Sequence, residues 1–268
     1  MRKVRLLLTA AICLLLPGFM KPFALRLLGH RVGRRARIGP SIILVDRLVL
    51  ADGSRIGGLN LISARRVVMR TNAYIGRMNT ITGRLSLGFA EHGAIGNRNV
   101  VNQGATLAPA HPVQLVIGTW SKITANHYVN VGESIRMGRY STIAGIGSQL
   151  WTHGFVHMSS GLDRAEIRGR IMIGDNVYIG AHSTIGPGIT IANAVAVGAH
   201  SSVAKSLLEP GVYVSQPLRF IPLTAEQRLA NLEGIPATRP GEVFYWRDGG
   251  GALPAAVKRA APLAEAAE

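Results

Sequence analysis

An aliphatic residue recurs every six positions along much of this 268-residue chain. A period of six fits neither the 3.6-residue repeat of a helix nor the two-residue alternation of a half-buried strand. Short strands joined by a turn at every sixth residue explain it, because three such units close one coil of a triangular prism. We therefore predict an all-β fold, a left-handed parallel β-helix. The longest unbroken run, with Gly or Ala after each aliphatic residue, is Ile173, Ile179, Ile185, Ile191, Val197 and Val203.

The same period is visible nearer the start of the chain. We expect the aliphatic side chains of this part to point into the prism and to stack between coils. Shorter in-phase runs follow at residues 75–87, 95–107 and 117–135. The residues of the early run are Ile38, Leu44, Leu50, Ile56, Ile62 and Val68.

Breaks in the six-residue phase mark loops. Extra residues fall near 73–74, at 89–94 and at 108–116, and the longest break runs from about 147 to 170. A solenoid places its insertions on the surface, where they often build a binding site. The longest break contains Trp151, His153 and His157.

Residues 1–29 precede the repeat and are apolar after a basic start. The apolar run ends at Leu16, too early to span a bilayer, and no Ala-x-Ala cleavage site follows it. We predict one or two helices that either lie on a membrane surface or cap the end of the solenoid, with a cleaved secretory signal as the less favoured alternative. The β-helix is expected over 30–222. A C-terminal extension over 223–268 should begin with a short helix near Thr224 and end in a disordered tail after Asp248.

The formal net charge of +16 favours anionic partners, either phosphorylated ligands or a membrane surface. No basic run with interleaved aromatic residues occurs, so nucleic acid is not an expected partner. Cys13 is the single cysteine, which excludes an intrachain disulfide and a cysteine metal site. We expect a cytoplasmic protein, either free or peripheral on the cytoplasmic face of the inner membrane.

The repeats resemble those of the hexapeptide-repeat acyltransferases. The resemblance is carried by residues 173–181, with the sequence Ile-Gly-Asp-Asn-Val-Tyr-Ile-Gly-Ala, and by the closing motif from Glu209-Pro210-Gly211 onward. It covers about residues 30–222 and is greatest to the maltose and galactoside O-acetyltransferases and to acetyltransferases of polysaccharide biosynthesis. It implies an obligate homotrimer with sites between neighbouring prisms. It also implies acetyl-CoA as acyl donor, direct transfer with a histidine base, and no required metal.

Acyl transfer to a hydroxyl needs a base, and histidine suits this role because its reference pKa of about 6.5 lies near working pH. The family keeps its catalytic histidine in the position of the longest break, so the resemblance points to His153 as the base. His157 would orient the acceptor or the first histidine. Asn126, Glu133 and Trp151 are the acceptor-binding candidates. The alternative is that these are ordinary turn and loop residues.

For the acyl donor, the resemblance points to Ala181 and Ala199, one coil of three hexapeptides apart. Their backbone groups would bond the pantetheine amides. Lys205 and Arg219 would meet the nucleotide phosphates, because phosphates need cations. Arg219 falls where Ser-Gln-Pro-Leu-Arg replaces the family's usual Gly-Asn-Pro-Ala-Lys. For Lys205, a solvated cation at a coil corner is the alternative.

The leading functional hypothesis is an O-acetyltransferase acting on a sugar or oligosaccharide in surface polysaccharide or lipid-linked oligosaccharide synthesis. A zinc enzyme resembling the hexapeptide-fold carbonic anhydrases is a second hypothesis, since His182 and His200 lie one coil apart. No third histidine has a suitable spacing. A non-catalytic trimeric scaffold is the third hypothesis.

Overall fold

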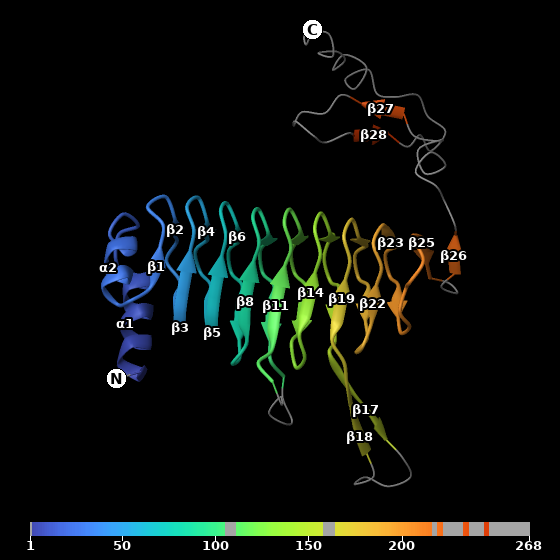
Figure 1. Cartoon of the computed structure of the whole chain (residues 1–268), viewed down its shortest axis with the longest axis horizontal. Coiled ribbons are helices and arrows are strands. Elements are labelled where there is room, and N and C mark those ends of the chain that lie inside the picture. The colour runs from blue at the N-terminus through green and yellow to red at the C-terminus, as the bar shows by residue number, and fades with distance from the viewer. Residues whose placement is uncertain are drawn as a thin grey trace. The chain divides into compact units, whose positions relative to one another are not determined.

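Successive coils of the chain stack in parallel as a solenoid (Figure 1). The computed structural model describes residues 2–104, 111–157, 164–215, 219–221, 233–235 and 244–246. The chain divides into two compact units, residues 1–220 and residues 221–268. In the second unit, β27 (Glu233–Ile235) pairs antiparallel with β28 (Phe244–Trp246). The helix expected near Thr224 and the tail after Asp248 lie outside the described residues.

The solenoid has three faces, each a stack of parallel strands, most of them short. The first face contains, in order, β2 (Arg37–Ile38), β4 (Arg55–Ile56), β6 (Tyr74–Ile75), β9 (Ala94–Ile95), β12 (Lys122–Ile123), β15 (Thr142–Ile143), β20 (Tyr178–Ile179), β23 (Val195–Val197) and β25 (Gly211–Val214). The strand β26 (Arg219–Ile221) follows them in the chain.

The other two faces are joined into one sheet by the long strands β3 (Ile42–Leu50) and β5 (Leu61–Met69). The second face continues with β7 (Thr80–Thr82), β10 (Val100–Asn102), β13 (Tyr128–Asn130), β16 (Gln149–Leu150), β21 (Thr184–Ile185) and β24 (Ser202–Val203). The third face contains β1 (Arg31–Val32), β8 (Ser86–Phe89), β11 (Gln114–Ile117), β14 (Ile135–Met137), β19 (Ile171–Ile173) and β22 (Thr190–Ile191). The predicted parallel β-solenoid is confirmed.

The aliphatic residues of the longest repeat run are all buried, as predicted. Ile179 pairs with Val197, which lies three hexapeptides further on. In the early coils Ile38, Leu50, Ile56 and Ile62 are buried as predicted. At Leu44 and Val68 the prediction was wrong by one position. There Ile43 pairs with Ile62 and Ile62 with Ile81, so each of these coils holds one residue more than three hexapeptides. Leu44 and Val68, expected to point inward, are therefore only half-buried. Their places in the core are taken by Ile43, Val45, Val67 and Met69.

The longest insertions leave the solenoid at the corner between the second and third faces, here called the insertion corner. It includes residues 103–104, 111–113, 131–134, 151–157, 164–170 and 204–206. The hairpin of β17 (His153–His157) and β18 (Arg164–Arg168) projects from this corner (Figure 1). The stacking continues across both long breaks, because Ile95 still pairs with Ile123 and Ile143 with Ile179.

The corner between the first and second faces is stabilised by a ladder of buried polar side chains, and we call it the ladder corner. Each member accepts the backbone N–H of the next member, at donor–acceptor distances of 2.9–3.4 Å. The ladder satisfies backbone donors that the turns would otherwise leave buried without a partner. Its members are Ser41, Asn60, Asn79, Asn99, His127, Ser148, Ser183 and Ser201.

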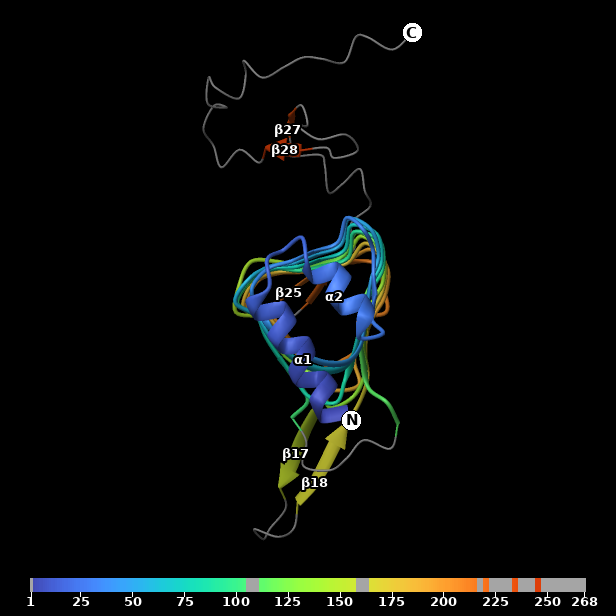
Figure 2. The same cartoon turned by 90° about the vertical axis from the view of Figure 1, so that its left-hand side faces the viewer.

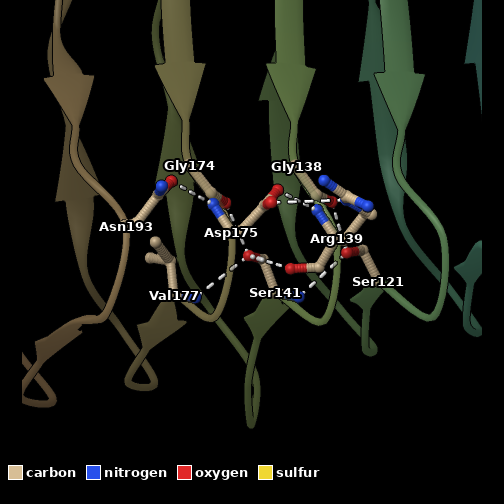
Figure 3. Close-up of polar contacts among 8 residues, drawn as sticks. All are labelled: Ser121, Gly138, Arg139, Ser141, Gly174, Asp175, Val177 and Asn193. Atoms are coloured by element: carbon tan, nitrogen blue, oxygen red, sulfur yellow. Dashed lines mark hydrogen bonds and ion pairs between the residues drawn. The ribbon is translucent and has the colours of Figure 1, made fainter.

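Serine hydroxyls serve the same purpose at the third corner (Figure 3). Ser141 Oγ accepts the Val177 N–H at 3.0 Å and donates to the Gly174 carbonyl at 2.7 Å. Asp175 adds a carboxylate that accepts the Arg139 N–H at 2.6 Å. The coils that carry Ser121, Ser141, Asp175 and Asn193 are therefore tied to one another at this corner as well.

Two helices cover the N-terminal end of the solenoid (Figure 2): α1 (Arg2–Leu15) and α2 (Lys21–Leu27). Cys13 and Leu25 are buried in the same core as the strands. The buried Lys21 ammonium donates to the Cys13 carbonyl at 2.6 Å, and burial lowers the pKa of Lys21. Burial also raises the pKa of the Cys13 thiol to about 12. Neither described helix is long and apolar enough to cross a membrane.

His127 is the one ladder member described whose side chain is titratable. Its Nδ1 accepts the Ser148 N–H at 3.1 Å, so Nε2 carries the proton toward Thr124 Oγ1 at 2.9 Å. Burial lowers the pKa of His127 to about 4. Between that value and about 6.5 the unfolded chain binds a proton that the folded chain does not, so stability falls as the pH is lowered through this window.

We expect His127→Asn to remove this loss, because Asn also accepts a backbone N–H, as Asn79 and Asn99 do in the ladder. Chemical denaturation at pH 7 and at pH 4.5 should show that the wild type loses more free energy of unfolding than the variant. The difference should be up to about 3 kcal/mol. His157→Asn, on the exposed hairpin, is the control. Equal losses in wild type and His127→Asn would contradict the assignment.

Candidate active site

Polar and aromatic side chains gather at the insertion corner around His153, the first residue of β17. The corner is formed by stacked coils, because Val129 of β13 pairs with Leu150 of β16. Residues that follow these two strands therefore lie next to each other. This places Asn130, at the end of β13, directly beside His153.

Asn130 fixes the protonation pattern of His153. Asn130 Oδ1 accepts the Gly132 backbone N–H at 3.2 Å, which identifies this atom as the amide oxygen. His153 Nδ1 lies 2.9 Å from the same oxygen and must therefore carry a proton and donate it. In the neutral imidazole, Nε2 then has no proton and carries a free lone pair. His153 is half-buried, and within the described ranges its Nε2 has no hydrogen-bond partner.

Asn130 is itself oriented by the neighbouring coil. Its Nδ2 donates to Asn102 Oδ1 at 3.2 Å, and Asn102 Nδ2 donates to the Tyr128 hydroxyl at 2.7 Å. Asn102 and Asn130 are register partners in adjacent coils. A side chain at Gly104 would come within 2.6 Å of Asn130 Nδ2, so the network needs glycine there.

Sequence reasoning missed Asn102, Asn130 and Tyr128. The available signal was an asparagine at the same position in two successive coils. An insertion between these coils sets the two asparagines further apart in the sequence than the three hexapeptides of an uninterrupted coil, such as the one from Ile179 to Val197. The repeat spacing is therefore hidden at this position.

Trp151 and Tyr128 form an aromatic wall beside His153. Their ring centroids lie 4.9 Å apart, and the Trp151 ring meets the His153 ring edge-on at 6.3 Å. Trp151 Nε1 donates to Gln149 Oε1 at 2.9 Å, which fixes the indole. An aromatic wall with a few polar groups is typical of sites for small molecules.

Glu133 lies at the same corner and is not a solvated loop residue. Its side chain is 11% exposed, and Oε2 lies 2.9 Å from His111 Nε2. Its backbone N–H donates to Thr152 Oγ1 at 3.0 Å. The Thr152 hydroxyl also lies 3.1 Å from Asn130 Oδ1, which connects Glu133 to the His153 network. His111 and Thr152 were not singled out from the sequence.

His157 lies at the outer end of β17 and is exposed. It is four residues from His153 along an extended strand, a rise of roughly 13 Å. The Phe155 ring lies between the two histidines, with ring centroids 6.2 Å from His153 and 6.4 Å from His157. The structure does not bring the two imidazoles together, and a role for His157 stays a prediction.

Asn126 lies at the ladder corner, at the other end of β13 from His153. It has a left-handed backbone with φ of 54°, and its N–H donates to the Asn97 carbonyl at 3.0 Å. Asparagine tolerates this conformation better than most residues, so the turn accounts for it structurally. Within one chain Asn126 does not contact His153.

The donor-binding candidates Ala181 and Ala199 also lie at the ladder corner, on adjacent coils. Ala181 is half-buried and Ala199 exposed. Within the described part of the chain, neither of their N–H groups has a hydrogen-bond partner. Two unpaired backbone N–H groups on successive coils, about 5 Å apart, can donate hydrogen bonds to the amide carbonyls of a pantetheine arm.

The two cationic residues expected to bind the phosphates of the acyl donor do not lie at the ladder corner. Lys205 is exposed at the insertion corner, after β24. The backbone of Arg219 belongs to β26, and its side chain lies outside the described part.

His182 and His200 stack at the ladder corner with ring centroids 4.9 Å apart. No group of three or more His, Cys, Asp or Glu suited to a metal occurs among the described residues.

One curated protein is similar in sequence to part of this chain. It is named probable macrolide acetyltransferase, from Lysinibacillus sphaericus, and is 26% identical over 115 residues. The alignment covers 36% of this chain and 63% of that protein, so the chain spans less than two thirds of the relative's length. No family model matches the chain.

Several solved structures are similar to part of this chain. AntD, an N-acyltransferase from Bacillus cereus in complex with dTDP and 3-hydroxybutyryl-CoA, has a TM-score of 0.44 and 22% identity, over 62% of this chain and 86% of that chain. A maltose O-acetyltransferase from Clostridium difficile 630 has a TM-score of 0.39 and 26% identity, over 50% of this chain and 68% of that chain. With both TM-scores below 0.5, neither structure carries an argument about the fold or the function of this chain. The hexapeptide repeat, the parallel solenoid and the curated relative together confirm that this chain resembles the hexapeptide-repeat acyltransferases.

Proposed function

We propose that this protein is an acyl-CoA-dependent O-acyltransferase with an acetyl donor, and that His153 is its general base. The observation that carries the proposal is the hydrogen bond from His153 Nδ1 to Asn130 Oδ1, which leaves Nε2 unprotonated. A fixed base of this kind is what direct transfer to a hydroxyl requires. The curated relative's name as an acetyltransferase supports the choice of acyl group.

In this mechanism His153 Nε2 takes the proton of an acceptor hydroxyl as that oxygen attacks. Bound acetyl-CoA supplies a thioester, whose carbon–sulfur bond breaks as the new carbon–oxygen bond forms. Asn130 holds the imidazole in one tautomer and stabilises the imidazolium, because its oxygen accepts the Nδ1–H throughout. The proton on Nε2 then passes to the departing sulfur, which returns His153 to its starting state.

The acceptor proposed is a sugar or oligosaccharide in surface polysaccharide or lipid-linked oligosaccharide synthesis. Trp151 and Tyr128 offer aromatic rings for one face of a sugar ring. Glu133 offers a carboxylate oxygen for a ring hydroxyl beside the base. Such acceptors lie at the cytoplasmic face of a membrane, so peripheral membrane association belongs to this proposal.

A homotrimer with shared sites is the third part of the proposal. The residues expected to act together fall into two groups at different corners of one prism. His153, Glu133 and Trp151 lie at the insertion corner, whereas Asn126, Ala181 and Ala199 lie at the ladder corner. A neighbouring protomer that sets its ladder corner against the insertion corner would unite both groups in one site.

We expect His153→Ala to lower kcat for CoA release from acetyl-CoA by about 10² to 10⁴, since this is the usual contribution of a general base. Asn130→Ala should lower kcat by at least about tenfold with little change in KM, because the imidazole loses its fixed tautomer. Asn130→Asp should recover part of the rate, since a carboxylate also accepts the Nδ1–H.

His92→Ala, at another corner of the solenoid, is the control for loss of a surface histidine. The assay measures release of free thiol with candidate sugar acceptors, and melting temperatures check that each variant is folded. Wild-type rates in His153→Ala would show that another group is the base. An Asn130→Asp variant no faster than Asn130→Ala would contradict the role given to Asn130.

The shared site can be tested by mixing two inactive variants. His153→Ala lacks the base, and Ala199→Trp places an indole beside the N–H groups proposed to bind the acyl donor. If each site takes its base from one protomer and its donor-binding N–H groups from the next, mixed trimers contain one intact site each. Co-expression in equal amounts should then restore about one quarter of wild-type activity.

Each variant expressed alone, and then mixed after trimer formation, is the control and should stay inactive. Size-exclusion chromatography with light scattering measures the oligomeric state of every preparation. No recovery on co-expression, in confirmed mixed trimers, would place the whole site within a single protomer.

A further inference from the structure

The outer surface of the two N-terminal helices is unusually apolar. Helix α1 buries Thr9 and Cys13 against the solenoid, yet its opposite side is also apolar. A surface helix of a globular protein is normally polar on the side that faces water, so an apolar outer side indicates a further partner. Figure 2 looks onto this end of the molecule. The exposed apolar residues, here called the end face, are Val4, Leu7, Leu8, Leu14, Leu15, Phe19, Met20, Phe23 and Leu27.

The part of the chain that forms this end carries only positive charge. Residues 1–45 contain nine Lys and Arg residues and no Asp or Glu. The first acidic residue is Asp46, which pairs with Arg2 at 2.6 Å. The nine basic residues are Arg2, Lys3, Arg5, Lys21, Arg26, Arg31, Arg34, Arg35 and Arg37.

A groove of about 680 Å³ joins the apolar and basic parts of this end. Phe19 and Pro22 line it on the helix side, and Arg34, Arg35 and Arg37 line it on the solenoid side. The three arginines are exposed, and within the described ranges none of their guanidinium groups has an acidic partner. Guanidinium groups bind phosphate well, because their donors match two phosphate oxygens at once.

We propose that this end of the protein docks on a bilayer that contains anionic phospholipid. The end face enters the interfacial layer, with Phe19, exposed by 84%, as its most exposed large apolar side chain. Arg34, Arg35 and Arg37 bind lipid phosphates from the groove. The inference deepens the proposed function, on whose membrane part it rests, by naming the surface and the lipid class.

A second copy of the chain fits this surface less well than a bilayer does. Two copies joined through their end faces would bring two sets of basic residues together with no acidic residue among residues 1–45 to compensate. Like charges held at an interface oppose association. An anionic bilayer offers both an apolar layer and negative charge, so it complements both features of this end.

Co-sedimentation with vesicles tests the proposal on the full-length protein. We expect tight binding to phosphatidylcholine vesicles that contain phosphatidylglycerol and at least tenfold weaker binding to phosphatidylcholine alone. About 1 M NaCl should weaken binding to the anionic vesicles strongly, because screening then acts within about 3 Å. Acetyl-CoA and acceptor are absent from this assay, so failure to bind vesicles is distinct from failure of acyl transfer.

Two sets of variants measure separately what the apolar side chains and the arginines contribute to vesicle binding. Phe19→Ser should weaken vesicle binding about tenfold, and the double variant Arg34→Gln/Arg35→Gln about twentyfold. Leu208→Ser, 67% exposed at the other end of the solenoid, is the apolar control. Arg70→Gln/Arg136→Gln, both exposed and outside the ladder corner and the insertion corner, is the charge control. Both controls should bind as the wild type does.

Equal binding to neutral and anionic vesicles would overturn the proposal, as would no binding to either. Self-association that Phe19→Ser abolishes, without vesicle binding, would show that a second copy covers the end face instead. If a test variant fails to fold, the comparison of lipid compositions and salt concentrations with the wild-type protein still decides the question.

Discussion

The structure depends on the register in which the strands of successive coils pair along the solenoid axis. In a parallel solenoid each short strand finds its hydrogen-bond partners only in the coil above and the coil below. Strands of two or three residues provide few such bonds, so the corners must contribute as well. The polar ladder from Ser41 to Ser201 and the hydroxyls of Ser121 and Ser141 do so by accepting backbone N–H groups of the next coil. The aliphatic core then fills the prism with one side-chain layer per coil.

This register also explains how a chemical site forms on so regular a scaffold. Insertions can leave the solenoid at one corner without disturbing the stacking, since Ile143 still pairs with Ile179 across the longest one. Residues at that corner on successive coils are then held a few ångströms apart. Asn102, Asn130 and His153 form one hydrogen-bonded row for this reason. The His153 imidazole is positioned by the coils beneath it, and the hairpin contributes the residue itself.

The fold was largely predictable because a six-residue period has few structural solutions. The six-residue repeat is easier to recognise in the sequence than the exact positions that point inward. One extra residue per coil in the early part moved the inward positions from Leu44 and Val68 to their neighbours. For the site, resemblance pointed to His153, Glu133 and Trp151, which the structure places at one corner. Asn130 and His111 could not be found in this way, because their contacts arise between coils separated by insertions of unequal length. The two-corner distribution of the candidates likewise appears only in three dimensions.

The central claim is that His153 acts as the base toward an acceptor hydroxyl, beside an acyl donor bound along the ladder corner of a neighbouring protomer. A crystal structure of the protein with CoA bound tests it most directly. We expect a pantetheine arm against the Ala181 and Ala199 N–H groups of one protomer, with its sulfur within about 4 Å of the His153 Nε2 of the next. A CoA sulfur far from every His153 imidazole, or a donor bound wholly within one protomer, would contradict it.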